Sequence, residues 1–183
     1  MITLETERLI LRTYMESDLP EYYRLLSDRE NMYYLDDIIT ETEENARQSL
    51  AEAIKLTKTG RARRFAITLS NELIGAAGYD IIEVTPLGRI GHMGWFILPE
   101  YQNKGYITEA AKRVLSYAFV EDGCVRIETG CYEENIPTQK VMDKVGFRLE
   151  AKKVKAKYHD GKMKNRLEYA VNKDEHQKKL GAE

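Results

Sequence analysis

The pattern of apolar and polar positions divides the chain into short strands and amphipathic helices that follow one another closely. Apolar runs and period-two alternation predict strands over 9–14, 65–69, 73–82, 90–98 and 125–131, and on both sides of a turn at 159–161. Apolar residues at helical spacing predict helices after residue 17 and over 43–58, 106–119 and 136–145. A loop is expected over 83–89. Helices interposed between strands in this order predict a mixed α/β sheet rather than a doubly wound one.

Residues with strong positional preferences punctuate these elements. Ser17 is a candidate N-cap for the first helix, and Thr40 with Glu43 matches a capping box for the second. Gly60 and Gly146 follow the last apolar positions of two helices, where a left-handed residue ends the helix.

The segment from Leu98 to Ala111 lies between an apolar strand and the start of a long helix. The first turn of a helix leaves backbone N–H groups without intrahelical acceptors, and the helix dipole favours negative charge at the same place. Gly105 lies in this junction, where the missing side chain allows a ligand to approach the backbone closely. The segment therefore predicts a phosphate-binding cradle.

Composition and charge narrow the class of protein. The chain has 183 residues, and 28 basic against 30 acidic side chains leave a formal net charge of −2, which argues against a dedicated nucleic-acid binder. The charged start, residues 1–8, lacks the apolar core of a signal peptide, and no apolar run approaches the ~20 residues of a membrane span. We expect a cytoplasmic protein of one domain over residues 1–183.

Two cysteines, Cys124 and Cys131, are too few for a disulfide framework and lack C-x-x-C spacing. We expect both to be small buried apolar residues near one strand. Neither has the base or the triad-like setting of a nucleophile, and the sequence predicts no metal site.

Three segments resemble the GNAT superfamily of acetyl-CoA-dependent N-acetyltransferases. The start Glu5-Thr-Glu-Arg-Leu-Ile-Leu-Arg12 is similar to the branch that contains the RimJ/RimL-type ribosomal-protein and spermidine acetyltransferases. Gly94 to Tyr106 resembles the central strand with its Q/R-x-x-G-x-G/A loop, and Asn135 to Phe147 resembles the N-x-x-S…K-x-G-F segment. The resemblance covers nearly the whole chain. It implies a GNAT fold with a mixed sheet of about seven strands and about four helices.

The resemblance also implies the ligand of the cradle. Main-chain amides after residue 102 would hold the pyrophosphate of CoA, and main-chain groups at the strand end would pair with the pantetheine arm as an added strand. Members of the family splay two parallel strands to admit this arm, here 90–98 and 125–131. The residues assigned to acetyl-CoA are Ile97, Leu98, Gln102, Asn103, Lys104, Gly105, Tyr106, Ile107, Thr108 and Asn135.

Four positions depart from the family pattern. Ile107 replaces a small residue, which is compatible with phosphate binding if its side chain points to the core. Met142 stands where many GNATs carry a proton-donating tyrosine, and a thioether donates no proton. Thr138 replaces a serine proposed for that role in the RimL-like branch. The glutamate proposed there as a base falls at about Lys157.

Acetyl transfer to an amine needs a base and a proton donor, for which the chain offers three candidates. His92 lies on the strand that leads into the cradle, and histidine titrates near neutrality. Glu128 on the neighbouring strand is a second candidate base, and Thr138 is a candidate donor. The alternatives are a histidine paired across the sheet or on its outer face, a solvent-facing strand glutamate, and a helix-start hydroxyl that bonds the backbone.

A segment between the first two helices contains the candidate acceptor-binding residues. Tyr33, Tyr34, Asp36 and Asp37 combine aromatic faces with carboxylates, which suit a cationic amine. The alternative is an exposed loop with two partly packed tyrosines.

The sequence thus predicts an N-acetyltransferase that moves acetyl from acetyl-CoA to a primary amine by direct attack in a ternary complex. The preferred acceptor is a protein N-terminal α-amine, followed by a polyamine or another small amine. An α-amine with a pKa of about 8 is roughly one-tenth unprotonated at pH 7, against about one in 2,500 for a lysine-like amine. A different functional class is the alternative: a CoA-binding sensor or interaction domain with little catalytic activity. A homodimer is common among relatives.

Overall fold

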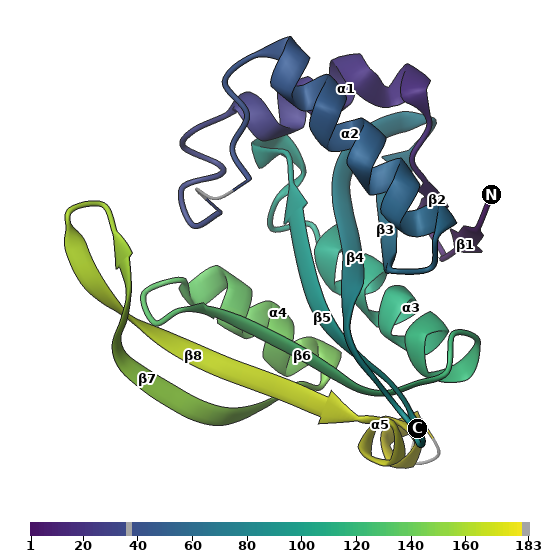
Figure 1. The fold of residues 1–183 in the computed structure, drawn as a ribbon, viewed down its shortest axis with the longest axis vertical. Helices are drawn as coiled ribbons and strands as arrows, with labels where there is room; N and C mark the ends of the chain where they lie inside the picture. Colours follow the sequence, from purple (N-terminus) through teal and green to yellow (C-terminus); the bar gives the residue numbers. More distant parts are fainter. Residues whose placement is uncertain (36–37, 181–183) are drawn as a thin grey trace. The chain divides into compact units, whose positions relative to one another are not determined.

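The computed structural model describes residues 1–35 and 38–180. Its elements follow the order β1 (Thr3–Glu5), β2 (Ile10–Thr13), η1 (Glu16–Asp18), α1 (Leu19–Ser27), α2 (Glu43–Lys58), β3 (Ala62–Leu69), β4 (Glu72–Thr85), β5 (Gly88–Ile97), η2 (Pro99–Tyr101), α3 (Tyr106–Val120), β6 (Cys124–Tyr132), α4 (Ile136–Val145), β7 (Arg148–His159), β8 (Lys162–Asn172) and α5 (Lys173–Leu180). Figure 1 traces them along the chain. The mixed α/β class is confirmed.

The strands are hydrogen-bonded in the order β1-β2-β3-β4-β5-β6-β8-β7. The strands from β1 to β4 pair antiparallel, each with the next along the chain. β5 and β6 pair in parallel from Arg89↔Cys124 to His92↔Glu128, and β8 runs antiparallel to both β6 and β7. The described chain therefore has one strand and one helix more than predicted, because β1 and α5 are short, terminal and weakly patterned.

The chain forms two compact units, residues 1–80 with 94–114 and residues 81–93 with 115–183. In the first unit, α1 and α2 place their apolar faces on β2–β4. The core there includes Leu25 and Leu26 of α1, Leu50 of α2 and Ala66 of β3, with Tyr14 and Tyr22 edge to face at 5.2 Å. This packing follows from the helical spacing of apolar residues in both helices.

The second unit is built around β6, β8 and α4. Ile127 and Thr129 of β6 are buried, as are Met142 of α4 and Val171 of β8. Gly146, with φ of 106°, ends α4 and lets the chain turn into β7. The long β7–β8 hairpin turns at Asp160 and Gly161, both of which adopt positive φ.

Three local predictions were wrong in detail. The N-cap of α2 is Thr42, which accepts from the Asn45 N–H at 3.2 Å, whereas Thr40 is buried and its hydroxyl donates to the Ile38 carbonyl. Ser17 lies inside η1, and Asp18 precedes α1. Most of the loop expected over 83–89 is strand, since β4 continues to Thr85 and β5 begins at Gly88. Sequence spacing alone does not choose between neighbouring capping residues.

No helix in the described residues is long and apolar enough to cross a membrane.

A buried ion pair fixes the entry to α1. Arg12 donates to both carboxylate oxygens of Asp18, at 2.8 and 2.7 Å, and Asp18 also accepts from the Met15 N–H at 2.8 Å. The Asp18 side chain is only 6% exposed, and its hydrogen bond raises the pKa of Arg12 above the ordinary value. The pair therefore ties β2 to the start of the helix.

Asp18→Ala should lower the free energy of unfolding by about 3 kcal/mol, because it leaves a largely buried guanidinium without its partner. Chemical denaturation at neutral pH measures this loss. The control is Arg47→Ala, which removes an exposed ion pair with Glu43 on α2 and should cost about 0.5 kcal/mol or less. Equal losses in the two variants would contradict the role given to Asp18.

Candidate functional site

The junction between β5 and α3 forms a compact turn in the first unit. The Leu98 N–H donates to the Ile74 carbonyl of β4 at 2.9 Å, and the Tyr101 N–H donates back to the Leu98 carbonyl at 3.0 Å. The Gln102 N–H bonds the Pro99 carbonyl at 3.1 Å and closes η2. The strand end is thus held to β4 while the chain turns toward the helix.

Two residues of this turn have left-handed backbone conformations. Asn103 has φ of 59° and Gly105 has φ of 82°. Alternation of right- and left-handed residues turns successive N–H groups toward one concave side, which is an anion-binding arrangement. At Gly105 a Cβ atom would be both strained and close to the guanidinium of Arg8, 3.4 Å away. The glycine is therefore required mainly by the backbone conformation.

The N-terminus of α3 opens onto this turn. Its first main-chain hydrogen bond joins the Glu109 N–H to the Gly105 carbonyl at 3.0 Å. The preceding amides, those of Tyr106, Ile107 and Thr108, have no intrahelical acceptor by the geometry of an α-helix. Ile107 is 9% exposed, so its side chain points to the core and does not cover the helix end. The backbone geometry of this turn and helix start is therefore compatible with the predicted cradle.

Cationic side chains border the cradle on aromatic surfaces. The Lys104 ammonium lies 5.5 Å from the centre of the Tyr101 ring, and the Arg8 guanidinium lies 4.5 Å from that of Tyr106. The Tyr101 hydroxyl donates to Glu72 at 2.8 Å, which raises the pKa of this tyrosine. Aromatic faces hold both cations near the helix end, where they add positive charge to that of the amides.

A bridge through Asn31 links the α1–α2 connection to the strand and the turn. The Asn31 amide donates to the Ile97 carbonyl at 3.0 Å, and the Gln102 amide donates to the Asn31 carbonyl oxygen at 2.7 Å. Asp28 orders this segment by accepting from the Glu30 and Asn31 N–H groups. Sequence reasoning missed Asn31, because a single asparagine in a loop carries no pattern.

The main-chain groups of Ile97 and Leu98 point to opposite edges of the strand. The Leu98 N–H faces β4, where it bonds Ile74. Neighbouring residues of a strand direct their main-chain groups to opposite edges, so the N–H and carbonyl of Ile97 face away from β4. The Ile97 N–H is therefore better placed than that of Leu98 to bond an added extended chain, while the Ile97 carbonyl already accepts from Asn31.

The predicted acceptor residues lie partly outside the described chain. Asp36 and Asp37 are in that undescribed stretch. Tyr33 and Tyr34 pack edge to face at 4.9 Å between ring centres, and Tyr33 is 37% exposed. This geometry leaves aromatic surface exposed at the segment.

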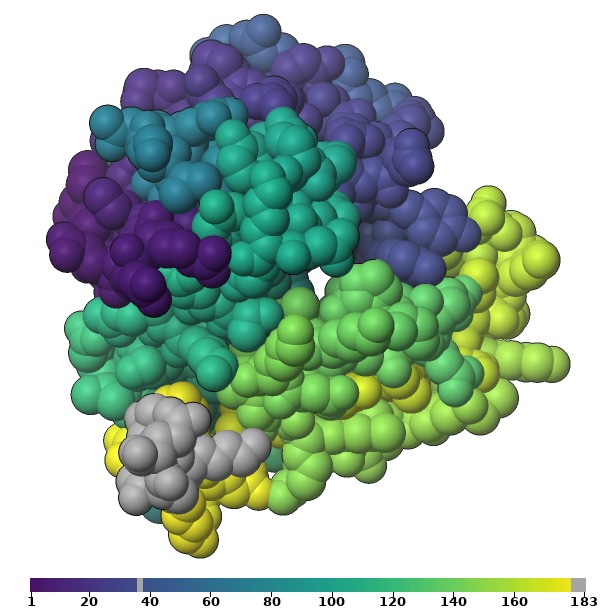
Figure 2. Space-filling view, turned by 180° about the vertical axis from the view of Figure 1, so that it is seen from behind, coloured from purple at the N-terminus to yellow at the C-terminus, as the bar shows by residue number. Residues whose placement is uncertain are grey.

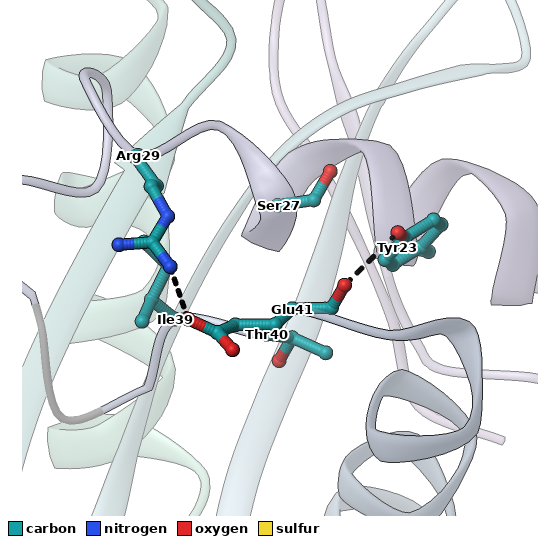
Figure 3. A pocket seen from close by; sticks show the side chains of 6 residues that line it. All are labelled: Tyr23, Ser27, Arg29, Ile39, Thr40 and Glu41. Atoms are coloured by element: carbon teal, nitrogen blue, oxygen red, sulfur yellow. Dashed lines mark hydrogen bonds and ion pairs between the residues drawn. The ribbon is translucent and has the colours of Figure 1, made fainter.

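A cavity of 270 Å³ lies between α1 and the segment before α2. Its lining consists of Tyr23, Ser27, Arg29, Ile39, Thr40 and Glu41. Figure 3 shows the Arg29 guanidinium directed at the Glu41 carboxylate, and the Tyr23 hydroxyl donating to the Glu41 main-chain carbonyl. The ion pair neutralises both charges, so the lining is polar and offers little net attraction for a polycation.

The two candidate bases lie opposite each other in the second unit. His92 is exposed, and its register partner on the parallel strand is Glu128. The Glu128 carboxylate accepts from Arg126 at 2.8 Å, and Arg126 also binds Glu150 at 2.5 Å. The Glu128 carboxylate is therefore engaged by Arg126, whereas the His92 side chain is exposed on the strand beside it.

The start of α4 brings Asn135 and Thr138 together. The Asn135 side-chain oxygen accepts from the Thr138 N–H at 3.3 Å, which makes Asn135 the N-cap. Its amide N–H₂ remains on the other side of the group as a donor. Met142 is fully buried in the same helix, so this position is a core position in this chain.

Lys157 and the two cysteines lie in parts of the sheet that suggest no role in catalysis. Lys157 lies opposite Lys164 in the β7–β8 hairpin. Cys124 and Cys131 are buried thiols, and burial raises the pKa of Cys131 to about 11, which keeps this thiol protonated at neutral pH. Within residues 1–35 and 38–180, no cluster of three His, Cys, Asp or Glu side chains is suited to a metal ion.

The sequence-predicted residues thus group by unit. The turn and helix start, with Ile97 to Thr108, belong to the first unit together with Tyr33 and Tyr34. His92, Glu128, Asn135 and Thr138 belong to the second.

Comparison with known proteins places the chain in a family. Residues 8–148 match the family model of the acetyltransferase (GNAT) domain. The uncharacterized N-acetyltransferase YnaD of Bacillus subtilis (strain 168) is 35% identical over 150 residues, which are 80% of this chain and 83% of that protein. The ribosomal-protein-serine acetyltransferase of Escherichia coli (strain K12) is 25% identical over 150 residues, 79% and 82% of the two chains.

A solved structure shows the same fold. The spermidine N-acetyltransferase from Vibrio cholerae, in complex with CoA and spermine, superposes with a TM-score of 0.82 at 21% identity, over 94% of this chain and 99% of that one. With the strand–turn–helix cradle and the family match over most of its length, the chain belongs to the GNAT acetyltransferase family and is an acetyl-CoA-dependent N-acetyltransferase.

Proposed function

We propose that this protein transfers acetyl from acetyl-CoA to a protein N-terminal α-amine, and that its two units work as one GNAT domain. One observation supports this choice of acceptor: few side chains near the site are able to take a proton from the amine or to give one to the thiolate. Glu128 is held in an ion pair, Met142 is buried, and His92 is an exposed imidazole. An enzyme with so little built-in base suits an amine that is already partly unprotonated at neutral pH.

The donor would bind along the β5–α3 junction. The amides of residues 103–108 would hold the diphosphate of CoA, with Lys104 at the rim. The Ile97 N–H would bond the pantetheine arm or polarise the thioester carbonyl. On the second unit, the Asn135 amide would donate to the cofactor while its oxygen caps α4. Bound acetyl-CoA supplies an activated thioester, and these groups orient it.

The chemistry is a direct displacement at the thioester carbon. The amine lone pair forms the new C–N bond, the C–S bond breaks, and the thiolate of CoA leaves. His92 would take the proton that the amine loses, directly or through water. Thr138, half-buried at the start of α4, would supply the proton to the thiolate.

The second candidate acceptor is a polyamine or another small amine. Its support is the pair of aromatic faces at Tyr33 and Tyr34 with their acidic neighbours in the sequence, and the spermine held by the Vibrio cholerae relative. In the cavity beside α1, Arg29 neutralises the Glu41 carboxylate, so this cavity offers no net negative charge to a polyamine, which favours the α-amine instead.

An acceptor panel separates these possibilities. With acetyl-CoA at pH 7, peptides with free N-terminal serine or alanine should show kcat/KM values about tenfold or more above those of spermidine and Nα-acetyl-lysine, since more of the α-amine is unprotonated. Release of the CoA thiol measures turnover. Preference for spermidine would contradict the proposal. Thermal stabilisation by CoA without turnover on any acceptor would indicate a sensor.

His92→Ala should lower kcat/KM by about 100-fold, the effect typical of a lost general base. The acid side of the pH profile should then follow the acceptor amine alone. Val84→Ala, on the exposed end of β4, controls for general effects of substitution and should keep the wild-type profile. An unchanged profile in His92→Ala would remove His92 from the mechanism.

Gly105→Glu should abolish the thermal stabilisation by CoA, because a carboxylate would enter the phosphate cradle. Gly161→Glu is a matched control, since Gly161 has a similar positive φ in an open hairpin turn. It carries the same backbone strain without touching the cradle. An undiminished CoA-induced shift in Gly105→Glu would contradict the cradle itself.

A further inference from the structure

An acidic side chain lies at the helix end that is proposed to bind the diphosphate. Glu109 is in the first turn of α3, and its main-chain N–H closes the helix onto Gly105. A carboxylate favours a helix N-terminus, but an unpaired one beside the cradle would repel the phosphates of CoA. What binds this carboxylate therefore matters for the donor.

Four donors from the β1–β2 connection converge on Glu109. One carboxylate oxygen accepts from the Thr6 hydroxyl at 2.6 Å and from the Arg8 main-chain N–H at 3.0 Å. The other accepts from the Arg8 guanidinium at 2.7 Å through Nε and at 2.6 Å through Nη2. Burial alone would raise the pKa of Glu109, but these hydrogen bonds outweigh burial and hold the pKa below its ordinary value.

Arg8 also contacts the turn itself. Its Nη1 donates to the Lys104 carbonyl at 3.1 Å, and its guanidinium lies over the Tyr106 ring at 4.5 Å. A Cβ on Gly105 would be 3.4 Å from Nη2. Arg8 thus contacts the residues on both sides of Gly105, Lys104 and Tyr106, and its side chain is 41% exposed. Figure 2 shows the N-terminal residues, in dark purple, on the surface beside the teal segment.

We propose that Arg8 is a positioning residue for the acetyl donor: it neutralises Glu109 and, with Thr6, holds the turn and the helix end in the shape that receives the diphosphate. We call Thr6, Arg8 and Glu109 the N-terminal clamp. The inference rests on the proposed cradle. It adds a residue far from the loop in sequence to the groups that determine affinity for CoA.

Electrostatic neutralisation and simple bracing predict different results. Arg8→Gln leaves the Glu109 charge uncompensated and should weaken CoA binding about tenfold. Glu109→Gln leaves Arg8 positive beside the cradle, so CoA affinity should stay equal to or exceed that of the wild type. The double variant restores neutrality and should bind more tightly than Arg8→Gln. If the clamp were only a brace, both single variants would weaken binding to a similar degree.

Isothermal titration with CoA and with 3′-dephospho-CoA, at low and high salt, tests these expectations. The loss in Arg8→Gln should be equal for both ligands and shrink at high salt, where charges are screened. Arg47→Gln, which also removes an arginine from an ion pair with a glutamate, is the control and should bind like the wild type. Thermal melting without ligand confirms that each variant is folded.

Three outcomes would overturn the inference. Equal weakening by Arg8→Gln and Glu109→Gln would reduce the clamp to a brace. A loss with CoA but not with 3′-dephospho-CoA would assign Arg8 to the 3′-phosphate and not to the diphosphate. Unchanged affinity in Arg8→Gln would remove its role altogether. In each case Gly105→Glu reports separately on the cradle, so failure of the clamp and failure of the proposed donor site remain distinguishable.

Discussion

The proposed donor site depends on one constraint, the unsatisfied amides at the first turn of a helix. At α3 these amides follow a turn with two left-handed residues, Asn103 and Gly105, so they are directed toward one exposed place. Helix geometry creates the demand for an anion, and the turn decides where the anion can sit. The buried side chain of Ile107 anchors the helix without closing this place.

The turn is held in shape by residues distant in the sequence. From the β1–β2 connection, Arg8 binds the turn and Thr6 binds Glu109 in the first turn of α3. Asn31 binds the turn from the α1–α2 connection. Without these contacts, an exposed loop would lose conformational entropy each time it bound a ligand, and the affinity for the ligand would be lower. The contact of Asn31 with both Ile97 and Gln102 also joins the segment expected to bind the acceptor to the strand end expected to bind the donor.

Proton transfer is the least specialised part of this protein. Met142 fills the core at the position of the family's tyrosine, and Lys157 lies in a hairpin opposite another lysine. The exposed His92 and the hydroxyl of Thr138 are the groups left for this work. Such a site depends on the acceptor bringing a free lone pair, which relates the choice of substrate to the chemistry of the enzyme.

The sequence by itself determined most of the elements and the position of the β5–α3 junction. α2, α4 and this junction were predicted closely, because helical periodicity and glycine position are local properties. The cap of α2 and the Arg126–Glu128 pair are also local, but several neighbouring residues could have made the same contacts, so spacing did not select Thr42 or the pairing of Glu128. Only the tertiary structure decided that Arg8 and Asn31 meet the turn after β5, because these contacts join residues far apart in the chain, which no local pattern encodes.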